Sequence, residues 1–371
     1  MAADYGSGPV NGHLYAGQLT PGSLHQPELG TTLGRNLDPC HRCPRRDLHR
    51  FYRWLHLGRQ VLIGKEDNVV PRENGPHDAD ADADADADIR AEMGTSRAVM
   101  DGAKHHGLAS LSGFPFEVRT SASTREQAGR LADLCAKAYS YLGDVLAYRP
   151  QYALVVLNRA DWSERASNPL YGMPYYSAGN LFLAGEPSDL LAWLEEVAGS
   201  APPPAAQVLD QVYGTGAGRL APFADLLVVH EMAHAFHDGV PFVFPRSWLM
   251  ELFADMAMYA FVVDCEPDRA LHLETLPRVA LENRLLKPVA RDLRYFEAFY
   301  PAIEPLTYVW YQFRLTMMAK GLIDAAGPNV LRRLWDAFAL SDEQLAGVLG
   351  SRVHPAAGQW LASWDEPQGE G

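Results

Sequence analysis

Residues 221–239, APFADLLVVHEMAHAFHDG, contain the pattern from which the rest of the chain can be interpreted. Apolar residues occur nearly all the way around the helix that this stretch predicts, so the helix must be buried. Pro222 suits the first helical turn, where its missing N–H has no partner to lose, and Gly239 suits the position that closes a helix. We therefore expect a buried helix whose few polar side chains need partners inside the protein.

Two histidines and a glutamate are the polar groups in the middle of this helix. His230 and His234 are four residues apart, so at about 100° per residue their imidazoles lie on one face, one turn apart. Imidazoles so placed can bind one zinc ion (Zn2+) at about 2.0–2.1 Å. Glu231 lies beside them, where it can reach a water molecule at the metal without binding the metal itself. This His-Glu-x-x-His pattern predicts a zinc centre with Glu231 as general base; the alternative is a pair of hydrogen-bonded core histidines with Glu231 in an ion pair.

The next apolar stretch, residues 246–263 (RSWLMELFADMAMYAFVV), carries two carboxylates. Glu251 and Asp255 are four residues apart and share a face of the predicted helix. Two carboxylates on a buried helix repel each other unless a positive charge lies beside them. We therefore predict that Glu251 is the third metal ligand, which leaves one coordination position for water. Asp255 is predicted to accept the outer N–H of one ligand histidine.

The segment HEMAH, followed 17 residues after His234 by Glu251 within WLMELFAD, resembles the gluzincin class of zinc metallopeptidases. Thermolysin and the aminopeptidase family related to leukotriene hydrolase belong to this class. The resemblance covers the two helices and, more loosely, residues 111–320. It implies a zinc hydrolase that cleaves peptide or amide bonds, with a carboxylate one turn after the third ligand that supports a histidine. The residues around Glu251 differ from the more common Asn-Glu-Gly, and the aminopeptidase motif rich in Gly, Met, Glu and Asn is missing.

The resemblance also implies groups that act on the substrate. Related enzymes stabilise the oxyanion with a Tyr or His from the helical half, and in residues 306–318 (LTYVWYQFRLTMM) Tyr308 matches their tyrosine better than Tyr311 does. An aromatic residue in such a helix can instead belong to the core.

The class also has an edge strand that pairs with an extended substrate. Residues 175–184 fit this strand, and the alternative is an ordinary sheet strand. His237 is a rival ligand, but we interpret it as an edge residue, because the third histidine of metzincins lies further on and follows a Gly.

Strand-like and helical patterns alternate before residue 220, whereas the pattern after it is nearly all helical. Strands are expected at 114–120, 152–157 and 177–184, and helices at 124–148 and 188–197. This order predicts an α+β fold of zincin-like type, with a small mixed sheet and helices followed by a mainly helical C-terminal half. Residues 111–220 would form the N-terminal α/β lobe of the catalytic domain, and residues 221–365 the helical lobe that carries the metal site.

The first 110 residues differ in composition from the rest of the chain. Gly, Pro, His and Arg are frequent, and Asp and Ala alternate strictly over residues 78–88. Six like charges in these eleven residues repel one another and bury nothing, which favours a solvated linker over a calcium loop or a strand. Cys40 and Cys43 have no second pair nearby, so we interpret them as part of a loop rather than a zinc knuckle. Residues 1–110 are therefore predicted to be a disordered or poorly structured extension.

Composition argues against several classes of protein. The formal net charge is −14 at pH 7, whereas nucleic acids and anionic membranes bind basic surfaces. The N-terminus lacks a cationic segment followed by an apolar run, and no apolar stretch approaches the length of about 18 residues needed for a membrane span. Cys135 and Cys265 lie in apolar helical patterns and are expected to be buried. We expect a soluble, cytoplasmic protein whose partner is a peptide or small amide substrate, with no nucleic-acid or membrane partner; the oligomeric state is not indicated.

Two alternatives to a peptidase keep the same fold. One is a zinc hydrolase of a small amide or ester metabolite, because substrate choice depends on pocket shape. The other is a binding protein that retains the zincin-like fold without turnover. The intact Glu231 favours an enzyme over this second alternative, since a protein without catalysis does not need the base.

Overall fold

In the computed structural model, the described part of the chain is residues 101–364 without 241–243, 301 and 338–344. Up to residue 100, the predicted extension, with its Asp-Ala repeat and its Cys-x-x-Cys pair, lies outside the described residues. Within them the fold is mixed α+β, as predicted, with a five-stranded sheet before residue 185 and only helices and loops after residue 220.

The sheet is mixed, with three parallel strands between two antiparallel edges. Its order is β1-β2-β3-β5-β4, in which β2, β3 and β5 are parallel. The strands are β1 Ala109–Leu111, β2 Glu117–Thr120, β3 Ala153–Leu157, β4 Tyr175–Ser177 and β5 Asn180–Ala184. The strand predicted at 177–184 is thus part of a hairpin, because Ala178 and Gly179 adopt positive φ angles of 47° and 73° and turn the chain between β4 and β5.

The central strand β3 is buried on both faces, as its uninterrupted apolar sequence predicts. On one face, Leu154 joins the main core, which also includes the apolar side of α3 (Arg125–Leu146). On the other face, Val155 packs with Trp162 of α4 (Arg159–Arg165) in a second, smaller core. Side chains alternate along a strand, so neighbours in sequence belong to different cores.

The sequence predicts that the first lobe starts at residue 111, but the described fold begins earlier. The turn η2 (Gly102–His105) and the strand β1 both include residues of the predicted extension. His105 is buried, with its Nε2 2.6 Å from Oδ1 of Asn180, and β1 pairs with β2. These contacts are made with residues later in the chain, so the composition of the segment did not reveal them.

Helices and turns make up most of the remaining described residues. The α-helices not yet given are α5 Asp189–Gly199, α6 Pro203–Tyr213, α7 Ala221–Asp238, α8 Ser247–Cys265, α9 Ala270–Glu282, α10 Leu293–Phe299, α11 Pro305–Ala326, α12 Val330–Asp336, α13 Leu345–Val348 and α14 Pro355–Ser363. The short 3₁₀-helices η3 Ala122–Thr124 and η4 Pro267–Arg269 and the π-helix η6 Leu349–Val353 complete the set. Ser188 begins α5 as a cap, since its hydroxyl accepts a hydrogen bond from the N–H of Leu191 at 3.0 Å. Prolines lie at the start of α6, because the first helical turn tolerates proline.

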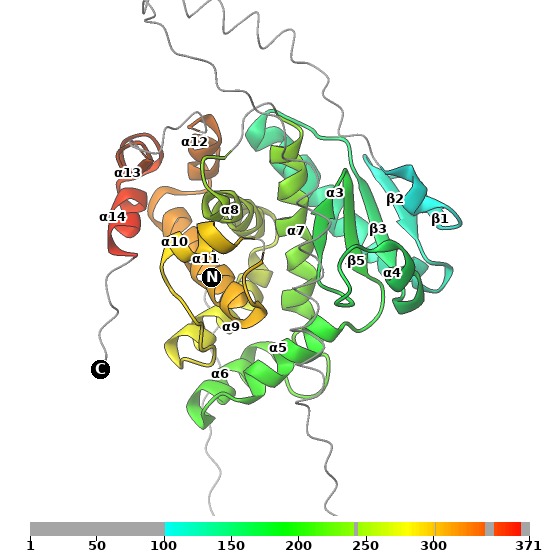
Figure 1. The fold of residues 1–371 in the computed structure, drawn as a ribbon, viewed down its shortest axis with the longest axis horizontal. Coiled ribbons are helices and arrows are strands. Elements are labelled where there is room, and N and C mark those ends of the chain that lie inside the picture. Colours follow the sequence, from blue (N-terminus) through cyan, green and yellow to red (C-terminus); the bar gives the residue numbers. More distant parts are fainter. Residues whose placement is uncertain (1–100, 241–243, 301, 338–344, 365–371) are drawn as a thin grey trace, which may run out of the picture. The chain divides into compact units, whose positions relative to one another are not determined.

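The helix α7 lies between the sheet and the helices α8 to α14 (Figure 1), and its bounds agree with the predicted ones. It contacts α3, β4 and β5 as well as α8 and α9. Gly239 follows its last turn, but with a φ of −85° rather than the left-handed conformation that favours glycine. A Cβ at this position would displace the hydroxyl of Tyr148, which donates a hydrogen bond to the Gly239 carbonyl at 2.8 Å.

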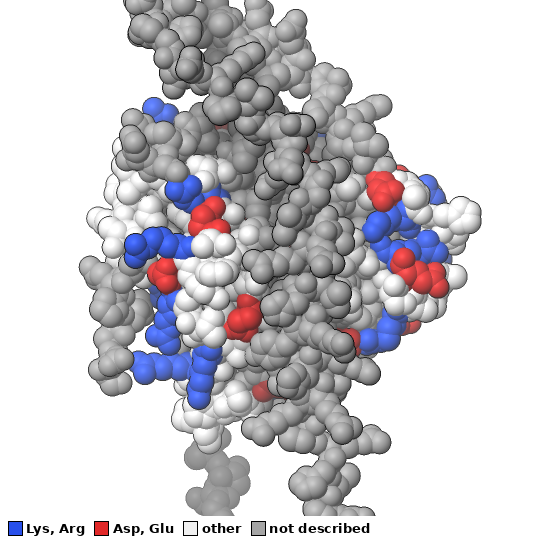
Figure 2. Space-filling view, in the orientation of Figure 1, with Lys and Arg blue, Asp and Glu red and all other residues white. Residues whose placement is uncertain are grey.

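The surface of the described residues carries charges of both signs and one exposed thiol. Over α4 and the strands beside it, Lys and Arg are interspersed with Asp and Glu (Figure 2), and Arg165 lies 3.3 Å from Asp161. None of the described helices has both the length and the hydropathy needed to cross a bilayer. Cys135 is buried, as predicted, whereas the prediction for Cys265 was wrong: it is exposed, because it is the last residue of α8 and lies beyond the buried stretch.

Candidate metal centre

The helices α7 and α8 pack against each other and bring three ligand-type side chains together. His230 and His234 come from α7 and Glu251 from α8, and all three are buried. Nε2 of His230 lies 3.2 Å from Oε2 of Glu251 and 3.3 Å from Nε2 of His234. Nε2 of His234 lies 3.9 Å from the same carboxylate oxygen. The three donor atoms therefore form a small triangle.

This triangle has the size that a zinc ion requires. Ligand atoms about 2.0–2.1 Å from zinc in tetrahedral geometry lie roughly 3.3 Å from one another. Two of the observed distances, 3.2 and 3.3 Å, match this value, and the third, 3.9 Å, is slightly longer. Imidazole nitrogens and a carboxylate oxygen are also the donor atoms that zinc binds in hydrolases. The residues present therefore fit zinc.

The charges of these residues favour a cation between them. Burial lowers the pKa of His230, but hydrogen bonds with Asp255 and Glu251 outweigh it and raise the pKa well above its ordinary value. Burial lowers the pKa of His234 to about 3, against the charge of Glu251. Burial raises the pKa of Glu251, but the hydrogen bond with His230 and the charges of both histidines lower it more, so this carboxylate stays ionised. One proton can bridge two of the three donor atoms, whereas a divalent cation can bind all three.

Asp255 holds the outer nitrogen of His230. Its Oδ1 lies 3.2 Å from Nδ1 of His230 and accepts a hydrogen bond from the hydroxyl of Thr316 at 3.0 Å. The sequence predicts such a partner for one of the two histidines, and the structure pairs it with His230. Oδ2 of Asp255 is buried and has no hydrogen-bond partner among the described residues. Burial raises the pKa of Asp255 more than its hydrogen bond with His230 lowers it, and a metal ion nearby would favour the carboxylate form.

Besides the histidines, three side chains of the described residues contact the Glu251 carboxylate, and the sequence indicated only one of them. The hydroxyl of Tyr300 donates to Oε1 at 2.7 Å, and the amide of Gln312 donates to Oε2 at 2.7 Å. The hydroxyl of Tyr308 lies 3.4 Å from Oε2. Gln312 is one turn after Tyr308 on α11, so its position on the same helix face was a usable signal. Tyr300 lies outside the helices, 49 residues from Glu251, and no sequence pattern pointed to it.

Of the two tyrosines that the sequence offers on α11, Tyr308 is the one that lines the cavity containing Glu231. Tyr311 is buried and donates a hydrogen bond to the carbonyl of Asp292 at 2.7 Å, so it belongs to the core. Burial and the charge of Glu251 raise the pKa of Tyr308 well above its ordinary value. Its hydroxyl therefore keeps its proton and can donate a hydrogen bond.

Glu231 lies beside the three ligand-type residues and adds no atom to their group. It is partly buried and lines a cavity together with His230 and Tyr308. Burial raises the pKa of Glu231 to about 8, while the positive charge of His230 lowers it and the charge of Glu251 raises it. A carboxyl group that titrates near neutral pH can both accept and release a proton. A divalent cation nearby would lower this pKa and favour the carboxylate.

His237 is not among the three ligand-type residues, and it is more than an edge residue. Its Nε2 lies 2.8 Å from Nδ1 of His234, on the ring nitrogen that does not belong to the donor triangle. Burial lowers the pKa of His237 to about 4, so this imidazole is neutral at neutral pH. His237 therefore contacts a ligand-type residue instead of serving as one.

An apolar cavity of ≈ 70 Å³ opens beside His230 and Glu231. Its apolar lining comes from Met173, Pro174, Leu190, Leu194, Phe223, Leu227, Val309 and Phe313.

The edge strand β4 contacts α7, and the hydroxyl of Tyr176 donates a hydrogen bond to Asp238 at 3.1 Å. Of residues 175–184, which the sequence predicts as one edge strand, only Tyr175–Ser177 lies at the sheet edge, next to the helix that carries Glu231, because the chain turns and Asn180–Ala184 forms the inner strand β5.

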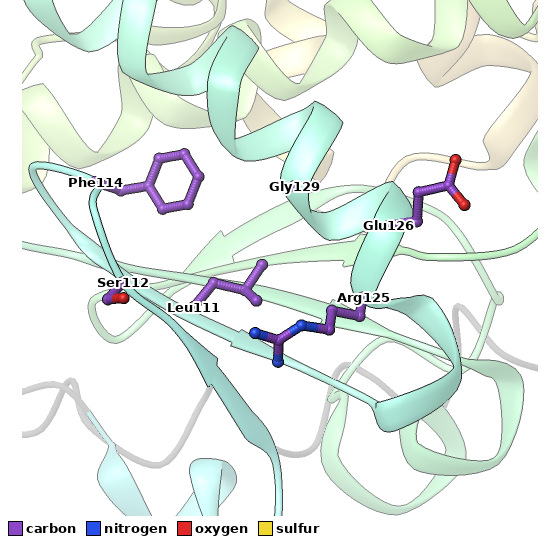
Figure 3. A pocket seen from close by; sticks show the side chains of 6 residues that line it. All are labelled: Leu111, Ser112, Phe114, Arg125, Glu126 and Gly129. Carbon is purple, nitrogen blue, oxygen red and sulfur yellow. The ribbon is translucent and has the colours of Figure 1, made fainter.

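A broader hollow lies between the segment after β1 and the first turns of α3 (Figure 3). It is lined by Leu111, Ser112, Phe114, Arg125, Glu126 and Gly129. Its ionisable side chains are one arginine and one glutamate, and no histidine or cysteine lines it. This hollow therefore lacks the groups for metal binding that the centre on α7 and α8 offers.

Comparison of the chain with protein-family models, with curated proteins and with solved structures gave no match. No relative therefore supplies a role for any residue, and the site itself is the basis for assigning a function.

Proposed function

We propose that this protein is a zinc-dependent hydrolase that cleaves peptide or amide bonds, and that the fold is zincin-like and of the gluzincin type. One observation carries the proposal: His230, His234 and Glu251 converge with donor-atom spacings that suit zinc, while Glu231 lies beside them and adds no ligand atom. Structural zinc sites are usually closed by four protein ligands, whereas catalytic sites keep one position open. Three ligand-type residues with an adjacent base therefore favour catalysis over a structural role.

Each residue has a role that follows from its position. A bound zinc ion would lower the pKa of a water molecule and polarise the carbonyl group of the substrate. Glu231 takes a proton from the attacking water on its carboxylate and returns it to the leaving nitrogen. Asp255 holds the proton of His230 on Nδ1, so that Nε2 presents its lone pair to the donor triangle.

The surroundings of the centre suit an extended substrate. No strand of the described residues pairs with the outer edge of β4, so this edge offers backbone groups for pairing with a peptide. The cavity of ≈ 70 Å³ next to Glu231 is lined mainly by apolar side chains. We therefore expect an apolar residue next to the bond that is cleaved.

Tyr308 is proposed to donate a hydrogen bond to the oxyanion. We expect Tyr308→Phe to lower kcat by about 100-fold or more, the usual cost of losing one such donor, without a change in zinc content. Tyr300→Phe is the matched control, because Tyr300 also donates to Glu251 but does not line the cavity. Steady-state kinetics of both zinc-loaded variants distinguish the two tyrosines. A greater loss of kcat in Tyr300→Phe would assign the oxyanion to Tyr300 instead.

Elemental analysis of the purified protein, followed by activity assays, tests the proposed function. We expect about one zinc ion per chain, cleavage within a broad peptide library, loss of cleavage with a chelator, and its return when zinc is added. A panel of small amides and esters, assayed in parallel, separates a peptidase from a hydrolase of small metabolites. A zinc-bound protein that cleaves neither class would be a binding protein, and a protein that binds no zinc would refute the proposal.

A further inference from the structure

The two ligand-type histidines have different outer partners. Nδ1 of His230 lies 3.2 Å from Oδ1 of Asp255, whereas Nδ1 of His234 lies 2.8 Å from Nε2 of His237. The first contact is a carboxylate–histidine pair of the kind that the sequence predicts. The second is a pair of imidazoles three residues apart on α7, and none of the roles proposed above uses it.

The position of one proton follows from this pair. Two ring nitrogens 2.8 Å apart share a single proton, so one donates and the other accepts. When His234 binds a metal through Nε2, its remaining proton is on Nδ1 and points at His237. Nε2 of His237 must then be the acceptor, and the proton of His237 itself lies on Nδ1.

The surroundings of His237 hold its ring in place for this contact. Its centroid lies 5.0 Å from that of His234, 5.4 Å from that of Phe244 and 6.5 Å from that of Phe253, all close to edge-on. Rings on several sides limit the rotation of the imidazole. A hydrogen bond in such apolar surroundings is stronger than one exposed to water.

We infer that His237 is a positioning residue for the metal centre, which accepts the Nδ1–H of His234 and so directs Nε2 of His234 into the donor triangle. The inference rests on the proposed function. It gives each of the two histidines an outer partner of its own, a carboxylate for His230 and a neutral imidazole for His234. Loss of such a partner typically weakens metal binding by about 10–100-fold.

Zinc affinity, measured by competition with a chelating dye, tests this role in the full-length wild-type protein and two variants. His237→Phe keeps a ring beside Phe244 and Phe253 but has no acceptor, so zinc should bind about 10–100-fold more weakly. His237→Gln places an amide oxygen near the position of the imidazole Nε2, so its affinity should stay within a few-fold of wild type. The unfolding temperature of the metal-free proteins should be similar for all three. In the cobalt-substituted proteins, the visible spectrum should change in His237→Phe and be restored in His237→Gln.

The outcomes separate failure of this inference from failure of the proposed function. Wild-type protein without measurable zinc affinity would overturn both. A wild-type protein that binds zinc, together with a His237→Phe variant of equal affinity, would overturn the role of His237 alone. Equal losses in both variants, with a lower unfolding temperature of the metal-free protein, would assign His237 to packing and overturn the role as well.

Discussion

A Glu231→Gln variant will bind zinc as the wild-type protein does and will hydrolyse substrate at least about 100-fold more slowly, the usual contribution of a general base. Glu231 is not part of the group formed by His230, His234 and Glu251, and glutamine has nearly the same shape, so the ligands should keep their positions. Glutamine cannot take a proton from water at neutral pH. The loss should therefore appear equally in kcat and kcat/KM.

Kinetics and zinc content measured on the same preparation test this prediction. Asp225→Asn is the matched control, because Asp225 is a partly buried carboxylate on α7 whose pKa is also raised by burial. It lines neither the cavity nor the ligand group, so its variant should retain both zinc and activity. Full turnover in Glu231→Gln would remove the proposed base. Loss of zinc along with activity would mean that Glu231 helps to bind the metal.

Replacing Glu251 with alanine is expected to have the largest effect on metal binding. The variant loses one of three ligand atoms, and the donors Tyr300 and Gln312 lose their acceptor. Loss of a hydrogen-bond partner of a ligand weakens metal binding by at most roughly 100-fold. Loss of a ligand itself should lower the zinc affinity by more than this. Because Glu251 is only 1% exposed, its removal also leaves His230 without one of its buried partners, which typically costs about 3–5 kcal/mol of the unfolding free energy.

Zinc content after dialysis and chemical unfolding of the metal-free protein measure the two effects separately. Glu251→Gln keeps the volume of the side chain, so it should lose zinc with a smaller loss of stability than Glu251→Ala. Asp264→Ala, at the exposed end of the same helix, should keep its zinc and serves as the control. Unchanged zinc content in Glu251→Ala would assign the third ligand to another residue.

Long apolar stretches and local end signals were enough to predict the two helices that carry the centre. The predicted stretches 221–238 and 246–263 compare with Ala221–Asp238 and Ser247–Cys265 in the structure. The buried strand β3 was equally predictable, because an uninterrupted apolar run needs cover on both faces. The start of the fold before residue 111 was not, because β1 depends on pairing with β2 rather than on its own sequence.

Within the site, the histidine pair and the carboxylate pair follow from helix spacing, but their surroundings do not. Tyr300 reaches Glu251 from the C-terminal end of α10, and no spacing in the sequence relates it to the ligand-type residues. For His237, the sequence offers only its spacing from His234, which differs from that of the third histidine in metzincins. Its contact with the outer nitrogen of His234 depends on side-chain orientation, which spacing does not reveal.

The sequence by itself determined which residues share a helix face, because an α-helix places positions four apart side by side whatever the rest of the chain does. It thereby selected His230 with His234, and Glu251 with Asp255. Only the tertiary structure decided that Asp255 meets His230, that Tyr300 and Gln312 hold Glu251, and that β4 lies beside α7. These contacts join residues far apart in the chain, so they depend on how whole helices and strands pack against one another.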